Sequence, residues 1–225
     1  TDLPPLSVLA DEAVSKTLGG DFPVASRAAD LVENGALDLR VLDAPVDNTL
    51  LISNTQVVVL VTAGESVAAL STTDDEFVDA VAGVHRDAFE SAATYDLRTP
   101  PLRRVRETLA DDIGADVRDD FDAVLEAVAP DQTDILDEVT VALLVAARND
   151  VLLYDISKWG EDVGIASKAT FSRTKTRLEE AGLIDTEKVP IDVGRPRLRL
   201  TVGDDRLVGD DPAAFAATAA ELLSR

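Results

Sequence analysis

The spacing of apolar residues predicts a small α/β domain over residues 1–96. Helical spacing occurs in two segments, at residues 1–18 and 23–34. Runs with strand character follow at residues 37–42, 49–52, 56–62 and 67–70. The continuously apolar run Val57–Val61 predicts the central strand of a mostly antiparallel sheet. Thr73 or Asp74 then caps a helix that ends near Ala93.

Prolines and helical spacing predict a helical connector over residues 97–130. Pro100 and Pro101 end one element and begin the next, and Gly114 separates two amphipathic segments. Arg98, Arg103, Arg104 and Arg106 lie together here with no acidic residue among them. They predict either a site for an anionic metabolite at a helix N-terminus or arginines paired with an acidic surface.

Residues 131–206 carry the pattern of a winged helix-turn-helix domain, so the predicted fold class is α+β. A first apolar helix follows Asp134, and the short run Val151–Tyr154 predicts a strand. Asp155 is expected to cap the next helix, and Gly164 permits the turn that follows. Ser167 caps a second helix, which ends at Gly182, and two strands at residues 183–189 and 197–202 follow it.

The second of these helices is the candidate DNA-reading helix. At about 100° per residue, Phe171, Thr174 and Leu178 share the side expected to face the core. The outer side and the helix start hold the predicted DNA contacts Ser167, Lys168, Ala169, Thr170, Arg173, Thr176 and Arg177. Arginine can pair with guanine in two hydrogen bonds, and threonine and alanine can contact base edges and the thymine methyl group.

The ribbon adds three predicted DNA contacts. Arg197 and Arg199 alternate with leucines, which places them on the outward side of a strand. Arg195 lies in the tip Gly194-Arg195-Pro196, where it could enter a minor groove.

Charge is distributed unevenly along the chain. The net charge is -22, from 21 Lys and Arg against 43 Asp and Glu. Residues 151–206 hold ten of the bases and ten of the acids, so the remaining 11 bases and 33 acids account for the whole imbalance. An acidic surface over an apolar core favours a protein from a halophile, and an acidic mesophile protein is the alternative.

Composition narrows the chemistry further. The chain has no cysteine, which excludes disulfides and thiol catalysis. No apolar run reaches the ~18 residues of a membrane span, and the N-terminal residues lack a secretory pattern, so a cytoplasmic protein without membrane contact is expected. No catalytic residue, metal ligand or cofactor is predicted, because the single histidine, His85, lies in a helical run and no phosphate-binding glycine loop occurs.

The run from Leu153 to Leu200, together with Asp47–Val61 and Leu97–Leu109, resembles the haloarchaeal transcription regulators of the TbsP type. The resemblance implies a cytoplasmic regulator associated with genes of central sugar metabolism. It supplies no ligand residues.

The resulting hypothesis is a homodimeric regulator that binds double-stranded DNA. An enzyme housed in the N-terminal domain and a winged-helix adaptor that binds protein are the alternatives. A C-terminal helix within residues 207–225 has an apolar stripe, which predicts either packing on its own domain or a dimer contact.

Overall fold

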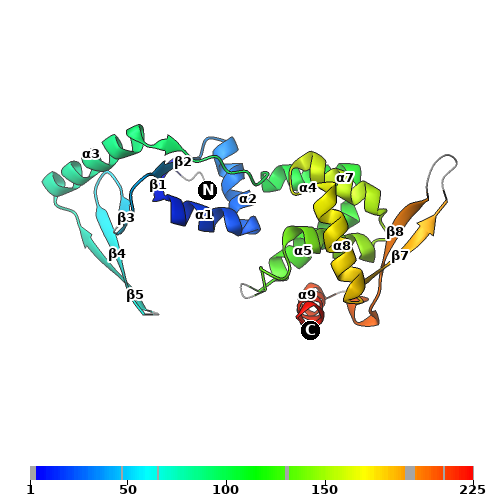
Figure 1. Ribbon diagram of the computed structural model, residues 1–225. Helices are drawn as coiled ribbons and strands as arrows, with labels where there is room; N and C mark the ends of the chain where they lie inside the picture. The colour runs from blue at the N-terminus through cyan, green and yellow to red at the C-terminus, as the bar shows by residue number, and fades with distance from the viewer. Residues whose placement is uncertain are drawn as a thin grey trace. The chain divides into compact units, whose positions relative to one another are not determined.

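The computed structural model describes residues 4–46, 48–64, 66–129, 132–190, 196–209 and 211–224 (Figure 1). Contacts divide the chain into two units, one formed by Thr1–Gly20 with Leu31–Leu97 and the other by Asp21–Asp30 with Arg98–Arg225. The predicted α+β class is confirmed: two three-stranded sheets with helices form the first unit, and helices followed by a two-stranded ribbon form the second.

The first unit contains two sheets. Its elements are β1 (Leu6–Asp11), α1 (Glu12–Gly20), β2 (Leu37–Leu42), β3 (Thr49–Ile52), β4 (Val57–Ala63), β5 (Ser66–Thr72), α3 (Asp75–Ser91) and β6 (Ala93–Thr94). One sheet has the order β1-β2-β6 and the other the antiparallel order β3-β4-β5. The prediction that Val57–Val61 forms a central strand is therefore confirmed.

The helix predicted over residues 1–18 is wrong in its first part. Leu6–Asp11 forms β1, which pairs in parallel with β2, and α1 begins only at Glu12. The pairing partner lies more than 25 residues away in the sequence, with Leu6 opposite Leu37, so local spacing could not reveal it.

The second unit is built from helices. It contains α4 (Leu102–Asp112), α5 (Ala115–Ala127), α6 (Glu138–Arg148), α7 (Leu153–Val163), α8 (Lys168–Glu180), β7 (Ile184–Val189), β8 (Arg197–Val202), the short 3-10 helix η1 (Asp205–Leu207) and α9 (Pro212–Leu223). Helix α6 lies at the centre, because every residue from Val139 to Ala147 is buried. A helix that is buried all round belongs to the core of its domain.

Helices α4 and α5, predicted as a connector, belong to this core. Val105, Leu109 and Phe121 are fully buried in it. Trp159 of α7 packs edge-on against Phe121, with ring centroids 6.4 Å apart, and its indole N–H donates to the Thr108 hydroxyl at 2.9 Å. The helix-turn-helix is therefore anchored on α4 and α5.

Part of α2 (Phe22–Glu33) also belongs to the second unit, which differs from the boundary expected at residue 96. Phe22 joins the apolar core of that unit. The buried Ser26 hydroxyl donates to the Pro100 carbonyl at 2.6 Å. These two contacts explain why residues 21–30 group with the C-terminal part of the chain.

The apolar stripe of α9 packs within its own unit. Phe215, Ala216, Ala219, Ala220 and Leu222 are buried in the same core as α6. The guanidinium of Arg148 lies 5.8 Å from the centre of the Phe215 ring. Of the two interpretations of this helix, packing on its own domain therefore accounts for the stripe.

Candidate nucleic-acid interface

Helices α7 and α8 form a helix-turn-helix. Gly164 ends α7 with φ +93°, a left-handed conformation that glycine adopts without a steric penalty. The Ile165 N–H donates back to the Gly160 carbonyl at 2.8 Å. Ser167 then caps α8, its hydroxyl accepting from the Thr170 N–H at 3.2 Å, as its sequence position predicted.

The starts of α6 and α7 differ from the sequence predictions. Helix α6 begins at Glu138 and not directly after Asp134, and Asp137 caps it, its carboxylate accepting from the Thr140 N–H at 2.7 Å. Helix α7 already begins at Leu153, so the strand predicted at Val151–Tyr154 is reduced to one bridge between Leu152 and Arg199. Asp155 therefore lies inside the helix and is not its cap.

Close packing fixes which side of α8 faces outward. Phe171 and Leu178 are fully buried, as the helical phase predicted. A Cβ added at Gly160 of α7 would lie 2.3 Å from two atoms of the Phe171 ring, so only glycine allows this approach of the two helices. The opposite side of α8 is thereby directed to solvent.

Most residues predicted to read DNA lie on that exposed side. Ser167, Lys168, Ala169, Arg173, Thr176 and Arg177 are exposed, and Thr170 is half-buried. Ser172 is also exposed. The prediction omitted Ser172, although at 100° from Phe171 its helical phase could have identified it.

Lysine charges beside α8 are largely compensated. The Lys168 ammonium forms an ion pair with Glu161 of α7, which raises the pKa of Lys168 and lowers the pKa of Glu161 through their shared hydrogen bond. The pair therefore stays charged at neutral pH. Lys175 pairs with Glu179 one turn along α8, with Nζ and Oε2 2.7 Å apart.

The two arginines of α8 have hydroxyl partners instead. Arg173 donates from Nη2 to the Thr170 hydroxyl at 3.3 Å, and Arg177 donates from Nη2 to the buried Thr140 hydroxyl of α6 at 2.8 Å. Neither guanidinium has a carboxylate partner among the described residues. Their positive charge therefore remains available to an anionic ligand.

Strands β7 and β8 form the predicted antiparallel ribbon, with Ile184 opposite Val202 (Figure 1). Leu200 is fully buried, and Arg197 and Arg199, which precede it on β8, are partly exposed. Arg197 donates to Asp155 at 3.3 Å and stacks 4.5 Å from the centre of the Tyr154 ring. Arg199 lies 3.8 Å from Glu187.

Two further points concern this ribbon. Arg195, predicted at its tip, lies outside the described residues. Lys188, which the prediction did not select, is exposed on β7 and has no carboxylate partner in the part of the chain that the structure describes.

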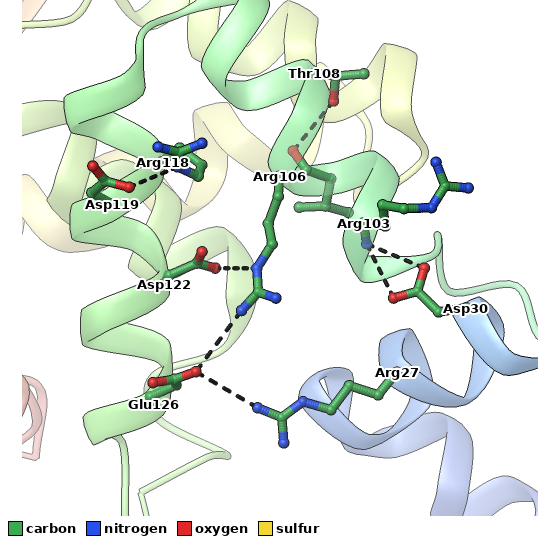
Figure 2. Close-up of polar contacts among 10 residues, drawn as sticks. Arg27, Asp30, Arg103, Arg106, Thr108, Arg118, Asp119, Asp122 and Glu126 are labelled. Carbon is green, nitrogen blue, oxygen red and sulfur yellow. Dashed lines mark hydrogen bonds and ion pairs between the residues drawn. The ribbon is translucent and has the colours of Figure 1, made fainter. Parts of the chain in front are cut away.

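Two of the four arginines around α4, Arg103 and Arg106, are engaged by carboxylates (Figure 2). Asp30 of α2 accepts from the Arg103 backbone N–H at 3.1 Å, which places an internal anion at the N-terminus of α4. The Arg103 side chain contacts Glu107 at 3.3 Å. Arg106 pairs with Asp122 of α5, with Nε and Oδ1 2.8 Å apart, and also approaches Glu126. Arg98 and Arg104 are exposed.

Metal-binding groups, His85 and membrane-spanning helices were the other features of interest. Among the described residues, no group of three or more His, Asp or Glu side chains could hold a metal ion. His85 Nδ1 lies 3.0 Å from the Val81 carbonyl within α3. Over the same residues, no helix is both long and apolar enough to cross a bilayer.

Comparison with known families agrees with this geometry. Residues 1–100 match the model for the N-terminal domain of transcriptional regulator TbsP-like proteins, and residues 101–220 match the model for their C-terminal helix-turn-helix domain. The chain belongs to the TbsP-like family of transcriptional regulators. No curated protein and no solved structure matches the chain. The TbsP-like helix-turn-helix model covers α4 through most of α9, the same helices that share one core.

Proposed function

We propose that this TbsP-like regulator binds specific sequences in double-stranded DNA with α8 in the major groove. The observation that carries the proposal is the pair Arg173 and Arg177, two exposed residues whose guanidinium groups have only hydroxyl partners among the described residues. The chain as a whole is acidic. Cations on one helix face that have no carboxylate partner can therefore bind phosphate and guanine directly.

Each part of the surface has a role in the proposal. Arg173 and Arg177 reach base edges, while Ala169, Thr170 and Thr176 provide small apolar and hydroxyl contacts. Ser167 and Lys168 lie at the start of α8, where a phosphate is favoured. Arg197 and Arg199 contact the DNA backbone or the adjacent minor groove, and so does Arg195, which lies outside the described residues.

High salt is the environment that we propose for this regulator, because the net charge of -22 is typical of proteins from halophiles. Phosphate contacts weaken steeply as salt rises. Base contacts, DNA shape and the two half-sites of a homodimer, about one helical turn apart, therefore carry the specificity. The place of action is the cytoplasm, where genomic DNA lies in an archaeon.

The proposal also covers the genes that the regulator controls and the effector that it binds. The family resemblance favours control of central sugar metabolism. An anionic metabolite is the proposed effector, and Arg98 and Arg104 are its best candidates because they are exposed. Arg103 and Arg106 already have carboxylate partners and would have to exchange them.

The decisive test is a mobility-shift assay in molar KCl with fragments selected from the native genome. The double variant Arg173→Ala/Arg177→Ala is expected to bind selected fragments at least tenfold more weakly, because each bidentate base contact contributes about 1–3 kcal/mol. Arg118→Ala is the control, since Arg118 pairs with Asp119 on α5. Unchanged binding by the double variant would reject the assignment of α8.

A winged-helix adaptor gives a different outcome. In that case the wild-type protein retains no genomic fragment at any salt concentration, although it is folded and elutes with another chain from the native host.

A further inference from the structure

The β3-β4-β5 sheet is free of charge in a highly charged protein. None of the three strands contains an acidic or basic residue, whereas 28% of the whole chain is charged. Between Thr49 and Thr73 the sequence has a single charged residue, Glu65. We call β3, β4 and β5 together the uncharged sheet. It interrupts the acidic character of the chain.

The uncharged sheet is apolar on both faces. Its register places Leu50, Val59 and Leu70 side by side on one face, and Leu51 and Val58 on the other. Strands with large apolar residues on both faces are typical of sheets covered on both sides. The sequence therefore specifies two-sided burial.

The first unit by itself does not provide that burial. Among the described residues of the uncharged sheet only Val57 is buried, and every residue of β5 except Thr72 is exposed. Leu51 is 57% exposed, Val67 65% and Leu70 66%. In α3, which contacts β3, Phe77 and Val84 are also exposed.

We infer that the uncharged sheet is covered by the uncharged sheet of a second copy of this chain. Charge favours this partner, because two chains of net charge -22 repel each other least where neither carries charge. Edge strand β5 has neither the lysine nor the proline that commonly protects a free edge from pairing with another strand.

Exposed apolar side chains lie on each face of the uncharged sheet. Val61 and Leu70 lie on one face, and Leu51 and Val67 lie on the other. Ala69 is also exposed and lies on the same face as Val67.

This inference rests on the proposed function in one respect: the two copies would present their α8 helices to two half-sites. The experiment uses the full chain in molar KCl and measures mass by light scattering or sedimentation equilibrium. The wild type is expected at twice 23.9 kDa. Val67→Glu is expected to be monomeric over the same concentration range.

Val208→Glu is the matched control. It makes the same substitution at a valine that is 67% exposed in the second unit, against 65% for Val67. It should remain dimeric, and far-ultraviolet circular dichroism should show both variants folded. A monomeric wild type, or a Val67→Glu protein with the dissociation constant of the wild type, overturns the inference.

A second measurement does not depend on a disruptive variant. Because the chain has no cysteine, Ala69→Cys provides a single thiol in the middle of β5. A bismaleimide should join two copies of this variant in high yield, while Val208→Cys should stay uncrosslinked. Equal yields at both positions would reject the uncharged sheet as the contact.

DNA binding separates the two claims. A dimer that crosslinks through β5 but binds no DNA would uphold this inference and reject the proposed function. A wild-type protein that binds its DNA site as a dimer, but whose Ala69→Cys variant does not crosslink, would uphold the proposed function and reject this inference.

Discussion

Two groups of arginines, on α4 and on α8, have the same chemistry but different surroundings. On α4, Arg103 pairs with Glu107, and Arg106 pairs with Asp122 of the neighbouring helix α5. On α8, Arg173 and Arg177 reach only threonine hydroxyls among the described residues. A guanidinium held by a carboxylate has its charge compensated and contributes to structure, whereas one held by a hydroxyl is oriented and keeps its charge.

The comparison also explains why a count of charges was a poor guide. Residues 151–206 hold as many acids as bases, yet the acids pair mainly with other cations: Glu161 with Lys168, and Asp155 with Arg197. The surface left to α8 is positive locally although the segment is neutral. Which cation is compensated depends on contacts and cannot be obtained from composition.

The largest loss of DNA affinity is expected when α8 is given a carboxylate next to its arginines, as the α4 arginines already have. Thr170→Glu places an acid three residues after the Ser167 cap, where it can accept from the Ser167 N–H and also attract Arg173. DNA affinity should fall at least tenfold, because the acid both engages Arg173 and repels phosphate.

Thr170→Gln is the control for that substitution, since glutamine also completes the capping pair but carries no charge. The thermal midpoint of both variants should equal or exceed that of the wild type. If Thr170→Glu binds DNA as tightly as Thr170→Gln, the positive charge of Arg173 does not contribute to DNA binding.

A second prediction concerns the packing that presents α8. Gly160→Ala forces a Cβ to within 2.3 Å of the buried Phe171 ring, so the free energy of unfolding should fall by about 1–3 kcal/mol. Chemical denaturation in molar KCl measures it. Adding Phe171→Leu removes the ring atoms in contact and should make the double variant more stable than the sum of the single effects predicts. Strict additivity would show that the two residues do not constrain each other.

The smallest change in stability and DNA affinity is expected from breaking an ion pair of α4. Arg106→Ala removes an ion pair between two partly exposed side chains, so the free energy of unfolding should fall by about 0.2–1 kcal/mol. DNA affinity should stay within twofold of the wild type. Asp122→Asn breaks the same pair from the other side and is the matched variant. A loss of DNA affinity in Arg106→Ala as large as in Arg173→Ala would remove the distinction between the two groups.

The sequence by itself determined the elements whose signals are local. The Ser167 cap and the phase of Phe171 and Leu178 follow from contacts between near neighbours in the chain. These features located the helix-turn-helix and its outward face. The continuous apolar run of β4 likewise identified a central strand, because it depends only on residue type.

Tertiary structure decided what depends on distant partners. Residues 6–11 became a strand because β2 lies beside them, and residues 21–30 joined the second unit through the Ser26 contact with Pro100. The tertiary structure also brings a carboxylate of α5 to Arg106 and a hydroxyl of α6 to Arg177. The physical reason is the same in each case: the energy of a hydrogen bond or ion pair depends on atoms within a few ångströms, and distance along the chain does not fix which atoms those are.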